Sequence, residues 1–174
     1  MNHVIELTPV VPLPVIMSCF ANHPGLVVFD SARQTRLLGR YSYLSADPVR
    51  TFEVEKAQYG IDPFADICEA LAEFPSEPLP DLPPFQGGAA GVLSYELGGC
   101  FERLPGVLHD ELQIPHLAVG IYDWVVAWDH VQNRAWIIST GYPETHSDRR
   151  AERARRRLES VLATIAGGWG GRDR

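Results

Sequence analysis

The chain has 174 residues, of which 45% are hydrophobic and 21% are charged, and its formal net charge at neutral pH is −7. This composition is typical of a folded globular protein and excludes a disordered chain. The negative charge argues against general binding to nucleic acid or to anionic membranes. The length is sufficient for one hydrophobic core, or for a large piece of a bigger one.

Three cysteines, Cys19, Cys68 and Cys100, lie far apart without a C-x-x-C pair. Scattered cysteines in odd number predict free, buried thiols in a reducing compartment. The apolar run at residues 8–21 contains three prolines and lacks the basic segment of a signal peptide. Since no apolar run reaches the length of a membrane span, we expect a cytoplasmic protein that does not contact a membrane.

The first predicted elements are two strands. Residues 25–31 (GLVVFDS) form an apolar run that begins at a glycine and ends in polar residues, as a buried strand does. Residues 39–48 alternate large and small side chains before Pro48, a pattern typical of a half-buried strand.

A helix is predicted next, over residues 62–74. Asp62 is suited to the N-cap and Pro63 to the first helical position. The proline-rich residues 75–84 predict a stiff connector. The residues of the helix that we expect to be buried are Phe64, Ile67, Cys68, Leu71 and Phe74.

Residues 84–98 (PFQGGAAGVLSYELG) are unusually rich in glycine and alanine. Their spacing matches neither G-x-G-x-x-G nor a Walker loop, which argues against a phosphate cradle. The stretch instead predicts a strand of small residues, where another backbone approaches closely.

Two strands and a long helix complete the prediction. Residues 117–130 and 134–140 flank a short turn and predict a β-hairpin. Residues 147–168 predict a helix that starts at Ser147 and is ended by Gly167. Its expected inward-facing residues are Ala154, Leu158, Val161, Leu162 and Ile165.

Strands and helices without a regular βαβ alternation predict an α+β fold. We expect an N-terminal segment at 1–19, a folded domain at 20–166 and a glycine-rich tail at 167–174.

Residue spacing alone indicates no catalytic site. The six histidines lack metal-ligand spacing, and Ser94 lacks the G-x-S-x-G context of a hydrolase nucleophile. We interpret Asp123 as a strand-edge residue and Asp129 as a turn residue rather than as an acid/base pair. The six arginines between 149 and 157 are interpreted as a solvated helix face rather than as a nucleic-acid site.

Three stretches, in order, resemble the N-terminal domain of the chorismate-utilising component I family. They are FDSARQTRLLGRYSYLSADP (29–48), LPPFQGGAAGVLSYELG (82–98) and LAVGIYDWVVAWDHVQNRAWIIS (117–139). This family includes anthranilate synthase and aminodeoxychorismate synthase (para-aminobenzoate synthase), and the resemblance covers about residues 20–165. PFQGG and IYDWVVAWDH are more similar to the aminodeoxychorismate synthase type, and Phe29-Asp30-Ser31 stands where anthranilate synthases carry a Leu-Leu-Glu-Ser motif.

The resemblance implies the fold, partners and cofactor of the complete enzyme. Its fold is an α/β sandwich in which this N-terminal part packs against a C-terminal chorismate-binding domain. That domain holds the Mg²⁺ ligands, the acid/base residues and the chorismate pocket, so we expect no catalytic residue, metal ligand or cofactor on this chain. The chain ends where the family continues, so we expect the C-terminal domain to be missing or separate. A glutamine amidotransferase subunit is the other implied partner. Gly99 and Cys100 replace a basic pair that family members often carry.

The resemblance also implies a tryptophan site in the N-terminal domain. The matching residues here are Phe29, Ser31, Leu38, Gly39, Arg40 and Tyr41. We expect the polar end of the amino acid at Ser31 and Arg40, and the indole at Phe29 and Tyr41. The alternative is that these residues merely complete a strand pair. Two further alternatives for the whole chain are the anthranilate synthase type and a stand-alone tryptophan-binding or interaction module.

Overall fold

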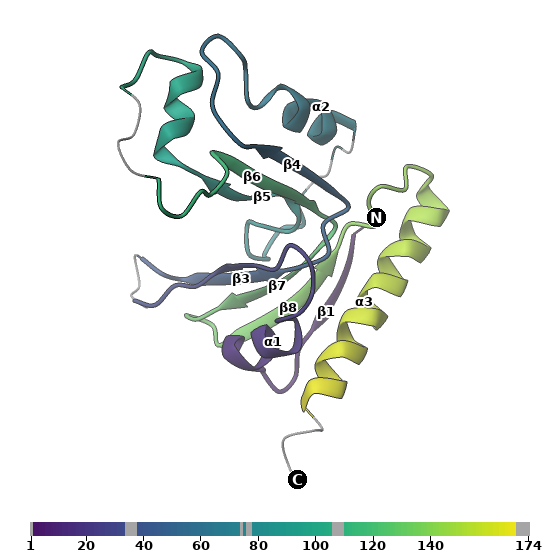
Figure 1. Ribbon diagram of the computed structural model, residues 1–174. Helices are drawn as coiled ribbons and strands as arrows, with labels where there is room; N and C mark the ends of the chain where they lie inside the picture. The colour runs from purple at the N-terminus through teal and green to yellow at the C-terminus, as the bar shows by residue number, and fades with distance from the viewer. Residues whose placement is uncertain (1, 34–37, 74, 76–77, 106–109, 170–174) are drawn as a thin grey trace.

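The computed structural model describes residues 2–33, 38–73, 75, 78–105 and 110–169, which form two antiparallel sheets and their covering helices (Figure 1). The predicted α+β class is confirmed. The strands are β1 (His3–Glu6), β2 (Val27–Phe29), β3 (Tyr41–Ser45), β4 (Arg50–Val54), β5 (Gly88–Leu93), β6 (Leu117–Tyr122), β7 (Trp124–Asp129) and β8 (Arg134–Ser139). The helices are α1 (Leu13–Cys19), α2 (Ala65–Glu73), the 3-10 helix η1 (Tyr95–Cys100) and α3 (Ser147–Trp169).

The larger sheet has the strand order β1-β8-β7-β3-β2, and α1 and α3 cover one of its faces (Figure 1). The core on this face includes Trp124 and Trp128, whose indole N–H groups donate to the carbonyls of Ala46 and Val11, both at 2.8 Å. These bonds satisfy the polar atoms that two buried tryptophans bring with them. The residues of α3 that enter this core are Leu158, Val161 and Ile165, as predicted, and Leu162 packs half-buried against it. Ala154 is also buried, as predicted.

The smaller sheet has the order β4-β6-β5, and its apolar face packs beneath α2 and η1. Gly91 in β5 explains the small residues of this stretch, because a Cβ there would strike the carbonyl oxygen of Ala118 in β6. The predicted close approach of a second backbone is therefore confirmed.

A single extended segment, β6 followed by β7, connects the two sheets. Tyr122 pairs with Gly88 in the smaller sheet, and Trp124 pairs with Ser139 in the larger one. Asp123 lies between them and is fully buried. Asp123 thus lies at a strand edge, as predicted, where β6 ends and β7 begins; it is buried there because the chain changes sheets.

Two arginines of α3 reach Asp123. Arg157 Nε lies 3.2 Å from Oδ1 and 3.3 Å from Oδ2, and only the second contact has hydrogen-bond geometry; Arg153 Nη2 lies 3.6 Å from Oδ2. Burial raises the pKa of Asp123, and this effect outweighs the attraction of the two guanidinium groups. Arg150 and Arg153 also donate to the carbonyls of Thr140 and Tyr142. The arginine-rich face is therefore only partly solvated, contrary to the prediction.

The helices differ from their predictions at particular positions. In α2 the buried residues are Ile67 and Ala70, whereas Cys68 and Leu71 are exposed, and Phe74 lies outside the described residues. All three cysteines are free, but of them only Cys100 is fully buried. Gly167 does not end α3, which continues to Trp169. Gly168 lets the helix pass close to Cys19 of α1, since a Cβ at this position would strike that sulfur.

Candidate functional site

An open pocket of about 620 Å³ lies between the two sheets. The residues of β2 and β3 on one side face β5 and the residues that precede it on the other. The lining consists of Val28, Phe29, Asp30, Ser31, Tyr41, Tyr43, Phe85, Ala89 and Ala90.

Four aromatic rings dominate this pocket. Phe85 meets Phe29 and Tyr43 edge-on, with centroid distances of 6.4 and 5.6 Å, and Tyr41 lies 6.2 Å from Tyr43. Burial raises the pKa of Tyr43 to about 12, so the ring stays neutral at physiological pH. Rings at these angles form an apolar surface suited to a flat aromatic ligand, and Ala89 and Ala90 leave the space for one.

Besides the two tyrosine hydroxyls, the polar side-chain groups of the pocket are a carboxylate and a serine hydroxyl. The Ser31 hydroxyl donates to the carbonyl of Tyr41 at 2.6 Å, so its oxygen can still accept a hydrogen bond. Asp30 is the charged residue of the lining and is exposed, but one of its carboxylate oxygens accepts the Ser42 hydroxyl at 3.3 Å on the helix-facing side of β3. Both groups accept hydrogen bonds, and one is negative, so this end of the pocket favours a cationic donor such as an ammonium group.

The structure brings together three of the six predicted residues. Phe29, Ser31 and Tyr41 line the pocket, whereas Leu38, Gly39 and Arg40 do not. Arg40 donates from Nε and Nη2 to Asp129 Oδ2, at 3.0 and 2.7 Å, and lies over the ring of Tyr41.

Asp129 was predicted to be a turn residue; it is the last residue of β7, and its side chain caps the turn that follows. It is almost fully buried at the end of β7 and accepts the backbone N–H groups of Val131 and Gln132. Burial alone would raise the pKa of Asp129, but the hydrogen bonds from Arg40 and from these two amides lower it overall.

The sequence prediction missed Asp30, Tyr43, Phe85, Ala89 and Ala90. Two of them lie in the same motif as the predicted residues: Asp30 stands between Phe29 and Ser31, and Tyr43 lies two residues after Tyr41 on the same face of β3. Phe85 and the two alanines lie in the small-residue stretch, which was assigned a purely structural role. Only the way the smaller sheet folds toward the larger one brings these residues to the aromatic cluster.

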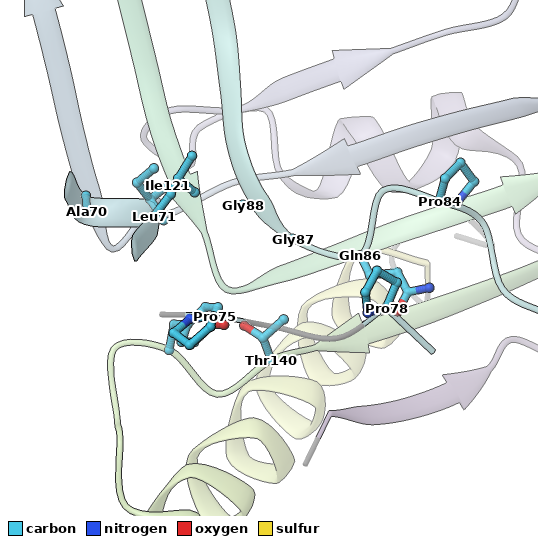
Figure 2. Close-up of a pocket in the computed structure, with 11 residues that line it drawn as sticks. Ala70, Leu71, Pro75, Pro78, Pro84, Gln86, Gly87, Gly88, Ile121 and Thr140 are labelled. Atoms are coloured by element: carbon cyan, nitrogen blue, oxygen red, sulfur yellow. The ribbon is translucent and has the colours of Figure 1, made fainter. Parts of the chain in front are cut away.

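A second, smaller pocket of about 230 Å³ lies between α2 and the Gln86–Gly88 segment (Figure 2). The Gln86 carboxamide is fully used by the backbone, because it accepts from Leu79 N–H and donates to the carbonyls of Leu79 and Pro83. The Thr140 hydroxyl donates to the carbonyl of Asp123. Since neither side chain directs a free polar group into the space, we assign no ligand to this pocket.

Two further features bear on possible function. Among the described residues, no group of three or more His, Cys, Asp and Glu side chains could hold a metal ion. Over the same part of the chain, every helix is too short or too polar to span a membrane.

Comparison with known proteins finds relatives that are all component 1 proteins of two kinds of synthase. The sequence matches no family model. It is 32% identical over 131 residues to aminodeoxychorismate synthase component 1 of Salmonella typhimurium, a match that covers 68% of the chain and 29% of the relative. The corresponding Escherichia coli protein is 32% identical over 146 residues, covering 80% of the chain and 29% of the relative.

Anthranilate synthase component 1 of Thermus thermophilus is similar to the same degree, at 31% identity over 164 residues, with 90% of the chain and 35% of the relative covered. The chain thus spans about a third of the length of these relatives. Over the part that it spans, the chain is homologous to aminodeoxychorismate synthase component 1 and to anthranilate synthase component 1.

Proposed function

We propose that this chain is the N-terminal, non-catalytic part of an aminodeoxychorismate synthase component I. The complete enzyme would convert chorismate to 4-amino-4-deoxychorismate, with ammonia from a glutamine amidotransferase subunit. Mg²⁺ and the chorismate pocket would belong to a C-terminal domain outside this chain. The similarity to the Salmonella and E. coli proteins and the PFQGG and IYDWVVAWDH motifs support this type.

The observation that carries the proposal is the aromatic pocket between the sheets. We propose L-tryptophan as its ligand, with the indole among Phe29, Tyr41, Tyr43 and Phe85. The ammonium group would bind Asp30 and the oxygen of Ser31. The lining of the aromatic pocket does not include Leu38, Gly39 or Arg40. The contacts that we expected these residues to make with the ligand therefore remain predictions.

Titration of the ¹⁵N-labelled chain with L-tryptophan, followed by NMR, tests the pocket. We expect shifts of the amides of residues 28–31 and 41–43, with weak affinity because Phe29 remains 43% exposed. Each Å² of apolar surface left in water forfeits about 25 cal/mol, and a loss of about 3 kcal/mol weakens binding roughly a hundredfold. Tryptamine, which keeps the ammonium group, should bind, and indole-3-propionate, which lacks it, should not.

Asp30→Asn should weaken binding of tryptophan about tenfold, the equivalent of about 1.4 kcal/mol. Asp66→Asn is the matched control, since it removes an exposed carboxylate on α2, outside the pocket. Equal binding by indole-3-propionate and tryptamine would contradict the assignment of the ammonium group to Asp30. Tight binding of tryptophan by the chain alone would favour the stand-alone tryptophan-binding module.

The catalytic part of the proposal has its own test. The pure chain, given chorismate, ammonia and Mg²⁺, should form no product above a control without protein. Addition of the remaining two thirds of the E. coli relative should yield 4-amino-4-deoxychorismate if the two parts associate. Anthranilate as the product would instead support the second candidate, the anthranilate synthase type, which the Thermus relative favours.

A further inference from the structure

Another pocket, of about 620 Å³, lies at one end of the smaller sheet, and no described residue lines both it and the aromatic pocket. The register brings three strand ends together there, because Val54 of β4 and Leu93 of β5 both pair with Leu117, the first residue of β6. The residues just beyond these ends form the pocket: Lys56 follows β4, η1 follows β5, and His116 precedes β6.

His116 is half-buried and is held by two backbone hydrogen bonds. Its carbonyl accepts the backbone N–H of Ser94 at 2.9 Å, and its ring Nδ1 accepts the backbone N–H of Ala57 at 2.9 Å. A backbone N–H can only donate, so Nδ1 is the acceptor and the neutral ring carries its proton on Nε2. His116 therefore brings to the pocket an N–H donor whose position and tautomer are set by the fold.

Glu96, in the first turn of η1, brings a carboxylate to the same pocket. The pKa of Glu96 is lowered, chiefly by its own backbone N–H and then by the nearby Ser94 hydroxyl. A positive charge on His116 also lowers this pKa, so the two side chains lie within electrostatic reach of each other. The carboxylate is ionised at neutral pH and suited to accept hydrogen bonds from an ammonium group.

The other side chains add an ammonium group, a second carboxylate and an apolar wall. Lys56, the only lysine of the chain, is exposed. Asp110 is also exposed, and its Oδ1 accepts the backbone N–H of Gln113 at 3.0 Å. The exposed ring of Tyr95 and the half-buried side chain of Leu104 supply apolar surface. The pocket thus combines donors for an anion, acceptors for a cation and a place for an apolar group.

We propose that this pocket binds a free α-amino acid with an apolar side chain. The ammonium group of the ligand binds Glu96, and its carboxylate accepts from His116 Nε2–H and from Lys56. The ligand side chain lies against Tyr95 and Leu104. An amine alone would leave the two donors unused, and an anion alone would be repelled by Glu96. The site is separate from the proposed tryptophan pocket and does not depend on it.

L-Leucine is the probe, and isopentylamine and isocaproate are its analogues without the carboxylate and without the ammonium group. In an NMR titration of the ¹⁵N-labelled chain, leucine should shift the amides of Ala57, Glu96 and Gly99 and leave those of residues 28–31 unchanged. Each analogue should bind at least about fivefold more weakly, since it loses one charged contact. Leucine that shifts none of the three amides, or that binds no more tightly than the analogues, would overturn the proposal.

Two variants of similar shape assign the two ends of the ligand. Glu96→Gln should weaken the binding of leucine and isopentylamine about fivefold and spare isocaproate. His116→Asn keeps an acceptor near the Nδ1 position for the Ala57 amide but lacks the Nε2–H, so it should weaken leucine and spare isopentylamine. Glu69→Gln, which removes an exposed carboxylate on α2, is the matched control and should change nothing.

A variant at Glu96 or His116 that binds leucine as the natural chain does would overturn the proposal. If His116→Asn fails to fold, the comparison of leucine with isopentylamine on the natural chain decides whether the carboxylate is recognised. The amides of residues 28–31 report separately on the aromatic pocket, so failure of the tryptophan proposal and failure of this one are distinguishable.

Discussion

Arg40 and Asp129 show how a residue near the pocket can serve the fold. The pair joins the start of β3 to the end of β7, and its two hydrogen bonds use one edge of the guanidinium group. Asp129 is almost fully buried, whereas Arg40 is substantially exposed. A buried carboxylate without this partner would depend on the two turn amides alone.

Arg40→Ala should therefore lower the free energy of unfolding at pH 7, because it removes the charged partner of the buried Asp129 carboxylate. The pKa of Asp129 is lowered in the folded state, so the stabilisation exists above the unfolded pKa and is lost as the pH falls through the folded pKa. Urea unfolding should show the largest difference between the two proteins at neutral pH and a smaller one in acid. If Arg40→Ala abolished tryptophan binding without loss of stability, Arg40 would be a ligand residue after all.

Asp123 has the opposite pH dependence. Its pKa is raised by burial, so the folded state binds the proton more tightly than the unfolded state does. The stabilising effect of the proton is present at low pH and is lost as the pH rises through the folded pKa.

Relative to Asp123→Asn, the natural chain should thus become less stable between about pH 4, where an unfolded aspartate titrates, and neutral pH. Thermal unfolding of both proteins across this range measures the difference, and the other carboxylates cancel in the comparison. Asp123→Ala, which leaves Arg153 and Arg157 without their carboxylate, should destabilise the chain at pH 7. If the natural chain instead became more stable relative to Asp123→Asn as the pH rises from 4 to 7, this account would be contradicted.

At the scale of elements, glycines determine how closely neighbouring segments approach. Gly91 allows β5 to pair with β6, because a side chain there would strike the backbone of Ala118 and Val119. Gly167 in α3 has no atom within 4 Å of the Cβ position. The two positions therefore predict opposite effects of the same substitution.

Gly91→Ala should destabilise the chain by at least about 2 kcal/mol, since the backbone must move to make room. Gly167→Ala should stabilise it by about 0.5–1 kcal/mol, because alanine loses less conformational freedom in a helix and nothing obstructs its methyl group. Chemical denaturation of the two variants beside the natural chain is the measurement. Equal effects at both positions would show that the β5–β6 approach does not limit side-chain size.

The sequence pattern predicted those elements whose signals are local. The β7–β8 hairpin follows from two apolar runs around a short turn, and α3 from its stripe from Ala154 to Ile165. By contrast, α1 was missed because prolines interrupt its apolar run, and Pro12 lies just before the helix. The burial of Asp123 between two sheets was not predicted, because its charged partners lie on α3, far along the chain.

The pocket also shows that local sequence patterns do not predict contacts between distant segments. Phe29, Ser31 and Tyr41 lie close together in one motif, so the motif was enough to find them. Phe85 reaches them only because β5 and the larger sheet fold toward each other, a contact between segments more than forty residues apart. No local sequence pattern predicts a contact between segments so far apart in the chain.

At the scale of the whole molecule, the two edges of the smaller sheet differ in their protection. β4 carries Arg50 and Glu53, charges of the kind that natural proteins place on exposed edges. β5 has the sequence GAAGVL, without a charge, and Val92 and Leu93 are exposed at its end. Among the described residues, β5 pairs with β6 alone.

We therefore expect the isolated chain to associate through β5, either with itself or with the remaining part of a component 1 protein. An unprotected, apolar edge offers free backbone hydrogen-bonding groups and apolar surface to another strand. Val92→Lys should reduce the association, because a lysine on an edge strand must stay in water. Val131→Lys is the matched control, since Val131 is 56% exposed against 57% for Val92 but lies in the β7–β8 turn. Size-exclusion chromatography with light scattering over a range of concentrations gives the mass of each protein. A natural chain that stays monomeric at the highest concentration, or a Val131→Lys variant that loses association as fully as Val92→Lys, would show that the β5 edge is not the contact.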